Sequence, residues 1–462
     1  MSDPKHTNKT TNPLMGGPSF SVKLRDDIAV ERFGKGQTTL FRNGVKFLDV
    51  PDSPLIECLI ENWITEASID QLAESAANPS AIYFMCEKLL SLGLLQTQCT
   101  VDGQPLFSLI PAPDWHAWLG NVPALLLGLT PSAYLRRDGH HFVLEVPLSQ
   151  RKCIIHDEKC LAWLMEIVQR RLSVSVEDPA RTAFYRALLL MNALEQNEDK
   201  WDHALWEFHD LLFFHHSSIG FHDDPIGATW RLKDKLPPEP LFKPCTGKYI
   251  SLPEPNGQFM EKLRAPFAEV LANRRTGRIP GERPIGIGEL GALLHLSARV
   301  QDVRNDPAQP CPVSLRPSPS GGALHSLEIY PLVSQCIGLA PGAWRYDPAQ
   351  HRLESIAAND ALLDAYLKSN PHAQIQGAGL PHIRLVVTSR ILRDSWKYEK
   401  IAYRLVLQDL GCLYQTLSLT ATALGLASCI LGTVDSRRLG DILKLEPLIE
   451  PVIGEMIVSS QY

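Results

Sequence analysis

The chain has 462 residues, of which 45% are hydrophobic and 21% charged, and its 45 basic and 51 acidic side chains leave a net charge of −6. This balance is typical of a globular protein and excludes collagen-like, wholly disordered and membrane-spanning chains. It carries no basic excess, so we expect neither nucleic acid nor a membrane as a partner. The length predicts about two to four domains.

Residues 1–19 are polar and lack the apolar core of a secretory signal, so we expect a disordered tail. The ten cysteines are scattered, and no two of them form a C-x-x-C pair. This pattern indicates reduced thiols rather than a disulfide framework or a structural zinc site. We therefore expect a cytoplasmic protein.

Residues 20–111 combine alternating apolar runs with signals for helix starts. The runs predict short strands before residue 50, whereas Ser53-Pro54 and Asn78-Pro79 each predict the first turn of a helix. A Val-Asp-Gly hairpin follows. This order is that of a winged helix-turn-helix, and the acidic balance favours a peptide ligand over nucleic acid.

Residues 112–200 repeat this order less clearly, with a predicted strand at 142–146 and predicted helices at 160–168 and 182–194. We interpret them as a second winged-helix-like module. Residues 201–255 are rich in histidine and proline, and proline density of this kind predicts a linker before a new domain.

Several histidines fall in or near this linker: His203, His209, His215, His216 and His222. No pair of them has the i, i+4 spacing of the H-E-x-x-H zinc motif, and no thiolate or carboxylate partners are arranged beside them. We therefore predict no metal site and interpret the segment as a helix that packs the linker against the following domain.

Residues 256–462 are predicted to form an α+β domain. A helix is predicted at 259–272, and a longer one at 398–424 has a broad apolar face. Strands are predicted at 327–333, 383–388, 428–431 and 452–458.

The first chemical motif follows the helix at 259–272 and reads Asn-Arg-Arg-Thr-Gly-Arg. It holds Arg274, Arg275 and Arg278 around Thr276. Three guanidinium groups within five residues suit a phosphate monoester, because each can donate two charge-assisted hydrogen bonds in a fixed fork. Taken alone, such a segment is more often a solvated basic turn.

The second motif is a Pro-x-Pro-Ser-Gly-Gly loop. Pro317 and Pro319 stiffen it, while Ser320, Gly321 and Gly322 allow the bare backbone to approach a flat ligand such as a flavin ring. No Walker lysine and no G-x-G-x-x-G helix start accompany it, so neither a nucleoside triphosphatase nor a Rossmann site is indicated.

The third motif is the pair Lys397-Tyr398, which we place in the first turn of the predicted long helix. A lysine that acts as a base needs its pKa lowered from ~10.4 to about 7–8, and burial can do this. The alternative is a lysine whose stem packs beside a core tyrosine.

Taken together and in this order, the motifs resemble those of the SagB-type azoline dehydrogenases, a branch of the nitroreductase-like flavoproteins that matures ribosomal peptides. The shared pattern runs from Arg-Arg-Thr-x-Arg through Arg-Pro-x-Pro-Ser-Gly-Gly-Ala to Lys-Tyr. The Trp-Glu-Phe-His segment at residue 206 is similar to that of the longer cyanobactin-oxidase group, whose members carry N-terminal peptide-binding modules.

The resemblance implies an α+β, FMN-dependent nitroreductase-like domain that forms a homodimer, preceded by tandem winged-helix-like modules. It implies cofactor contacts at Arg274, Arg275, Thr276, Arg278, Pro319, Ser320, Gly321, Gly322 and Gly432, and a catalytic pair of Lys397 and Tyr398. The implied reaction oxidises a thiazoline or oxazoline to the azole, with Lys397 as the base and a hydride passing to the flavin.

The implied partners are an azoline-containing precursor peptide with its leader, and possible cooperation with a cyclodehydratase. Two alternatives stay open. One is an NAD(P)H-dependent nitro- or quinone reductase of the same fold. The other is a non-catalytic peptide-binding scaffold that retains the flavin domain only for assembly.

Overall fold

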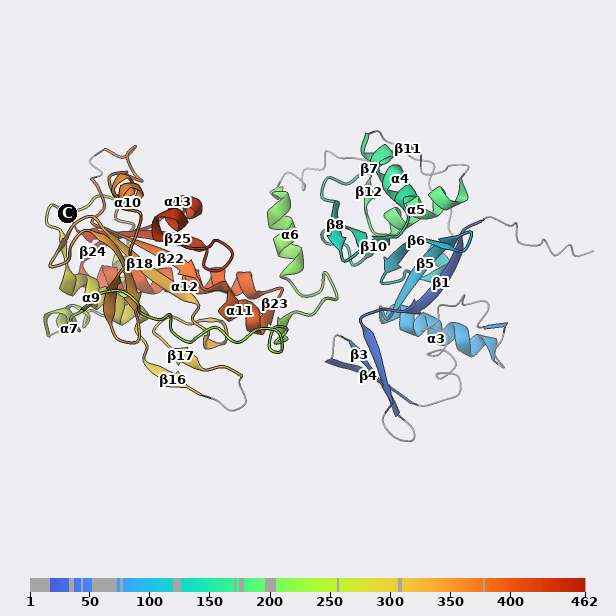
Figure 1. The fold of residues 1–462 in the computed structure, drawn as a ribbon, viewed down its shortest axis with the longest axis horizontal. Helices are drawn as coiled ribbons and strands as arrows, with labels where there is room; N and C mark the ends of the chain where they lie inside the picture. Colours follow the sequence, from blue (N-terminus) through green and yellow to red (C-terminus); the bar gives the residue numbers. More distant parts are fainter. Residues whose placement is uncertain are drawn as a thin grey trace, which may run out of the picture. The chain divides into compact units, whose positions relative to one another are not determined.

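The computed structural model describes residues 17–32, 37–42, 45–51, 73–74, 78–118, 126–169, 172–173, 178–195, 205–255, 257–305, 310–376 and 379–461. It divides into two compact units, Met1–Asp224 and Pro225–Tyr462 (Figure 1).

The N-terminal unit is built on a six-stranded antiparallel sheet in the order β1-β5-β6-β10-β9-β8. Its strands are β1 (Ser19–Leu24), β5 (Leu95–Val101), β6 (Gln104–Ile110), β8 (Tyr134–Asp138), β9 (His141–Glu145) and β10 (Lys152–Ile155). Because β6 pairs with β10, strands from both predicted winged-helix-like modules join one sheet.

Smaller elements surround this sheet. They are the sheet of β2 (Ile28–Arg32), β3 (Gln37–Arg42) and β4 (Val45–Pro51), the sheet of β7 (Leu126–Leu129), β11 (Leu172–Ser173) and β12 (Leu194–Glu195), and η1 (Trp115–Trp118). The helices are α3 (Pro79–Ser91), α4 (Glu158–Gln169), α5 (Pro179–Leu190) and α6 (Phe208–His216). The start of α3 is capped by the Asn78 side chain, as predicted. The helix predicted after Ser53 lies outside the described residues, and the winged-helix assignment stays a prediction.

The C-terminal unit contains a seven-stranded antiparallel sheet in the order β14-β21-β20-β18-β22-β25-β24. Its strands are β14 (Tyr249–Ser251), β18 (Leu327–Val333), β20 (Gly342–Asp347), β21 (Arg352–Ser355), β22 (Ile383–Ser389), β24 (Leu426–Ile430) and β25 (Val452–Ser460). The four strands predicted in this domain are confirmed as β18, β22, β24 and β25.

Helices cover both faces of this sheet, so β18 and β22 are buried at every position. One core contains α9 (Ile287–Ala298) and α12 (Ala402–Leu424), and the other contains α10 (Asp360–Leu367) and α13 (Ser436–Leu443). Alternate residues of β18 point into the two cores, Ile329 into the first and Tyr330 into the second. Among the described residues, no helix is long and apolar enough to span a bilayer.

Further short elements complete the unit. They are β13 (Gly227–Ala228), β15 (Ile285–Gly286), β16 (Asp302–Arg304), β17 (Val313–Leu315), β19 (Cys336–Ile337), β23 (Tyr398–Glu399), η3 (Gly321–Ala323), α7 (Gly257–Lys262), α8 (Phe267–Asn273) and α11 (Ile391–Lys397).

Two predicted helices differ from those observed. The helix predicted at 259–272 is broken into α7 and α8 at Pro266, which lacks the N–H that a continuous helix requires. The helix predicted at 398–424 begins only at Ala402, so placing Lys397-Tyr398 in its first turn was wrong. Lys397 instead ends α11, and Tyr398 pairs with Ala228 as part of β23.

The proline-rich segment 236–244, here called the proline strap, is held tightly to the C-terminal unit. Prolines offer carbonyl acceptors but no N–H donors, and buried side chains donate to these carbonyls: Trp396 to Leu236, Arg390 and Arg393 to Pro240, and Arg345 to Pro244. The segment predicted as part of a linker is therefore fixed to α11 and β20.

Beside the strap, Glu354 anchors the chain through a buried carboxylate that is 2% exposed. Burial opposes its ionisation, but it accepts hydrogen bonds from the backbone N–H of Gly247 at 2.6 Å and from Arg345 at 2.6 and 2.8 Å. These bonds lower the pKa of Glu354 from its ordinary value of 4.5 to about 2. This carboxylate therefore stabilises the fold above pH 4.5, and its contribution disappears as the pH falls towards 2.

We expect Glu354→Gln to lower the free energy of unfolding at pH 7 by about 3 kcal/mol, because it leaves the buried Arg345 with only the more distant Glu328, at 3.5 Å, as a charge partner. The difference from wild type should shrink between pH 4.5 and 2. Urea denaturation across this range measures both effects, with Glu261→Gln on exposed α7 as the control. Equal stability of the Glu354 and Glu261 variants at pH 7 would contradict the prediction.

Candidate functional site

Lys397 ends α11 as a buried side chain that is 7% exposed. Its Nζ lies 5.1 Å from the ring centre of Trp230 and 5.3 Å from that of Tyr398. Burial lowers the pKa of Lys397, while nearby Cys311 raises it by a smaller amount. The site therefore favours the neutral amine more than water does.

The predicted pair and the predicted loop meet at Gly322. A methyl group on Gly322 would lie 2.4 Å from the Tyr398 hydroxyl oxygen and 2.7 Å from Lys397 Nζ. Gly322 also has a φ of +60°, which glycine adopts without strain. The structure thus brings Lys397, Tyr398 and the diglycine loop together in one corner, here called the Lys-Tyr corner.

Asp409 of α12 holds this loop in place. It accepts hydrogen bonds from Ser320 Oγ at 2.6 Å and from the Gly321 N–H at 3.0 Å, and Ser320 Oγ in turn accepts from the His325 N–H at 2.9 Å. The Gly321 N–H, one of the backbone groups predicted to contact a flavin edge, therefore donates to Asp409, and Pro319 is exposed. Sequence reasoning assigned no role to Asp409, although an acid on the apolar face of a helix was a usable signal.

Two acidic groups lie near Tyr398. Asp394 of α11 is fully buried, and burial, with a smaller effect from Asp409, raises its pKa to about 7. Burial also raises the pKa of Asp409, and burial together with both carboxyl groups raises that of Tyr398. Asp394, close to the Lys-Tyr corner, can therefore hold or release a proton near neutral pH.

A small cavity is lined in part by this loop. It measures about 20 Å³ and is lined by Arg316, Pro319, Ser320, His325 and Asp409 among others. That is room for about one water molecule, whereas cofactor-sized pockets measure roughly 300–1,000 Å³. A large ligand would therefore contact the outer face of the loop rather than this cavity.

The arginine segment lies against β24 instead. The Gly277 N–H donates to Ser428 O at 2.9 Å, and a methyl group on Gly277 would lie 2.8 Å from the Ala427 Cβ. Arg274 is half-buried, whereas Arg275, Thr276, Arg278 and Gly432 are exposed. Within the part of the chain that the structure describes, no ion pair joins these arginines to a carboxylate.

The strand registers place the arginine segment far from the Lys-Tyr corner. Glu328, at the start of β18, is level with Thr388 and Val452, whereas Ala427 of β24 pairs with Ser459. Seven residues along β25 correspond to about 23 Å, and the three strand spacings from β18 to β24 add about 14 Å sideways. The arginine segment and the Lys-Tyr corner of one chain therefore lie at opposite ends of the sheet.

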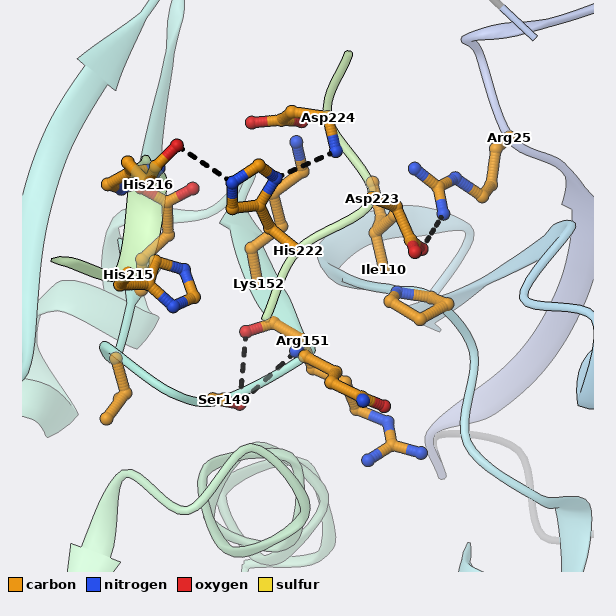
Figure 2. Close-up of a pocket in the computed structure, with 14 residues that line it drawn as sticks. Arg25, Ile110, Ser149, Arg151, Lys152, His215, His216, His222, Asp223 and Asp224 are labelled. Atoms are coloured by element: carbon orange, nitrogen blue, oxygen red, sulfur yellow. Dashed lines mark hydrogen bonds and ion pairs between the residues drawn. The ribbon is translucent and has the colours of Figure 1, made fainter. Parts of the chain in front are cut away.

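His215 and His222 of the N-terminal unit form hydrogen bonds with backbone groups (Figure 2). His215 Nδ1 accepts from the Leu148 N–H at 2.9 Å, and His222 bridges the His216 carbonyl at 2.9 Å and the Asp224 N–H at 3.2 Å. Burial and the neighbouring His216 and His222 lower the pKa of His215 to about 4. His203 lies outside the described residues.

A larger groove of about 410 Å³ lies beside these histidines in the N-terminal unit. Its apolar lining comes partly from α6 and the residue pair before it, through Trp206, Phe208, Leu211 and Phe214. Trp206 and Phe208 are both exposed, so the groove offers aromatic surface to a ligand.

Comparison with known proteins matches each unit to a family. Residues 271–459 match the Nitroreductase family, and residues 128–223 match the family of the cyanobactin oxidase ThcOx. A protein of Methanocaldococcus jannaschii assigned by name to the nitroreductases is 27% identical over 191 residues, which cover 41% of this chain and 90% of that protein.

Three solved structures are similar at lower identity. A nitroreductase-type protein of Ralstonia eutropha is 21% identical, covering 49% of this chain and 99% of its own, with a TM-score of 0.35. The E. coli microcin synthetase McbBCD, solved with truncated pro-MccB17, is 20% identical, covering 51% and 82%, with a TM-score of 0.34. A nitroreductase-type protein of Desulfovibrio desulfuricans, solved with FMN, is 14% identical, covering 42% and 86%, with a TM-score of 0.27.

We expect Gly322→Ala to displace Lys397 and Tyr398, because its methyl group would lie within 2.7 Å of both polar atoms. Gly139→Ala is a matched control, since Gly139 has a similar φ of +58° but nothing within 4 Å of the added methyl. Both changes carry the cost of a left-handed alanine, about 1 kcal/mol. Thermal unfolding should show a larger loss of stability for Gly322→Ala than for Gly139→Ala. Equal losses in the two variants would contradict the close approach of Gly322 to Lys397 and Tyr398.

Proposed function

We propose that this chain, which carries a nitroreductase-family domain and a cyanobactin oxidase ThcOx domain, is an FMN-dependent azoline dehydrogenase. It oxidises thiazoline or oxazoline rings of a ribosomally made peptide to the aromatic azoles. The observation that carries the proposal is the meeting of Lys397, Tyr398 and Gly322 in one corner, because a base and bare backbone are what this oxidation requires beside a flavin.

The residues fit FMN in their chemistry. Arg274, Arg275 and Arg278 carry no paired carboxylate among the described residues, so their guanidinium groups are suited to a phosphate. Gly322 leaves a space that a side chain would fill, directly beside Lys397 and Tyr398. When bound, FMN supplies the two-electron acceptor for the oxidation.

In this proposal Lys397 is the base that takes the acidic proton of the azoline ring at Nζ. Its burial lowers the pKa, so a larger fraction of the amine is neutral and able to accept a proton at physiological pH. The Tyr398 hydroxyl orients the ring or relays the proton. Burial together with Asp394 and Asp409 keeps Tyr398 protonated, because all three raise its pKa.

The separation of the two groups of site residues supports a site shared between two copies of the chain. A single chain places its arginines and its Lys-Tyr corner at opposite ends of the sheet, about 23 Å apart along the strands. Directly before the arginines, α8 presents Phe267 and Leu271, which are 65% and 47% exposed. An exposed apolar pair of this kind is typical of a helix that packs against a partner. We therefore propose a homodimer in which each FMN contacts both copies.

For the peptide partner, we propose that the N-terminal unit holds the precursor and its leader. The aromatic groove lined by Trp206 and Phe208 supports this role, because it lies within the ThcOx-matched segment and is large enough for side chains of a peptide. A cyclodehydratase would supply the azoline rings, since these form by loss of water from Cys, Ser or Thr residues.

Mass spectrometry of an azoline peptide incubated with the protein tests the activity. We expect loss of two hydrogens per ring. Lys397→Ala should keep the yellow cofactor but lower azole formation roughly 10²–10⁴-fold, the usual contribution of a general base. A near-normal rate would overturn the role of Lys397. Bleaching of the flavin by NAD(P)H without peptide turnover would instead identify a reductase, and a colourless protein would point to a scaffold.

A complementation experiment tests the shared site. Chains bearing Arg278→Ala and Lys397→Ala, each with its own tag, are co-expressed and the heterodimer is isolated through both tags. If each FMN contacts both copies, one site of the heterodimer combines the two intact halves, and about half of the wild-type activity returns. If each chain builds its own site, both sites carry a defect and the heterodimer stays as inactive as the parent variants.

A further inference from the structure

Trp230 belongs to the segment that the sequence predicts as a linker, yet it lies directly on Lys397. Its backbone N–H donates to the Lys397 carbonyl oxygen at 3.1 Å, and its ring centre is 5.1 Å from Lys397 Nζ. Its own backbone has a φ of +57°, which a tryptophan adopts only where its surroundings hold it. The residue is therefore fixed over the amine by both its backbone and its ring.

The contacts on either side explain this rigidity. Gly227 and Ala228 pair with Glu399 and Tyr398 as the β13–β23 ladder, and Thr229 Oγ1 donates to Glu399 Oε2 at 2.9 Å. These bonds fix the chain immediately before Trp230. They also tie it to the strand that carries Tyr398.

On its other side the indole packs edge-on against Trp396, with ring centres 5.6 Å apart and an interplanar angle of 82°. Trp396 is buried and donates its indole N–H to the Leu236 carbonyl of the proline strap at 2.8 Å. Trp230 is therefore linked to the proline strap through Trp396.

We propose that Trp230 is a positioning residue for Lys397, whose indole covers the amine, keeps water away from it and orients it towards Gly322. This inference deepens the proposed function, since it rests on Lys397 acting as the base. The proline strap and β13 then serve as the support of the base, although they lie about 160 residues earlier in the chain.

Two effects of the indole on the amine oppose each other. Exclusion of water favours the neutral amine, whereas the π face favours the ammonium ion. Burial lowers the pKa of Lys397, and in this proposal the exclusion of water outweighs the attraction of the π face. The titratable groups that act on the corner are Cys311 on Lys397, and Asp394 and Asp409 on Tyr398.

Competitive acetylation of the full-length, FMN-bound protein measures the result without relying on activity. The extent of labelling of Lys397 is followed by peptide mass spectrometry across pH, with exposed Lys248 as the internal reference. We expect Trp230→Ala to raise the apparent pKa of Lys397 by about one unit, because water then reaches the amine. Trp230→Leu should give a smaller rise, and Trp230→Phe should restore most of the wild-type value.

Tyr249→Leu is the matched control, because it removes an aromatic ring 4.5 Å from the Arg352 guanidinium, on edge strand β14. It should leave the Lys397 titration unchanged. An unchanged or lowered pKa of Lys397 in Trp230→Ala and Trp230→Leu overturns the proposal. If Trp230→Ala does not fold, the order Trp, Phe, Leu in the remaining proteins decides the question in the same way.

The pH profile of azole formation separates this inference from the proposed function. The acid limb should move upwards together with the labelling titration in Trp230→Ala and return in Trp230→Phe. A labelling shift in a protein that never forms azoles would leave the covering role of Trp230 intact while removing the dehydrogenase activity. An activity loss without a labelling shift would reduce Trp230 to a structural residue and contradict the proposal.

Discussion

The candidate site depends on one close approach, that of the backbone at Gly322 to the two polar atoms of Lys397 and Tyr398. Three separate parts of the chain have to be held in place for it. Asp409 of α12 fixes the loop through Ser320 and Gly321, the β13–β23 ladder fixes Tyr398, and the strap fixes α11.

Much of this architecture followed from local pattern. The strands β18, β22, β24 and β25 were predictable because each is a short apolar run, and the start of α3 because Asn78 and Pro79 are strong local signals. The sequence also singled out the diglycine loop and the Lys397-Tyr398 pair, which the structure brings together, while their roles stay predictions.

The features that the sequence did not predict depend on contacts between residues far apart in the chain. Tyr398 leaves the helical pattern because it pairs with Ala228, about 170 residues earlier, and no property of residues 398–424 reveals this. Trp230 and the proline strap were predicted to belong to a linker, because a high density of prolines is typical of segments without regular structure. In the structure, buried arginines donate hydrogen bonds to carbonyl groups of the strap. Asp409 was visible as an acid on an apolar helix face, but its partners could be named only from the fold.

The attachment of Trp230 also bears on how the C-terminal unit begins. Only five residues lie between Asp224, the last residue of the N-terminal unit, and Trp230. The first residues of the C-terminal unit are therefore the ones that pair with Tyr398 and contact Lys397. A change at the junction of the two units would thus act directly on the ladder that fixes Tyr398, without passing through the seven-stranded sheet.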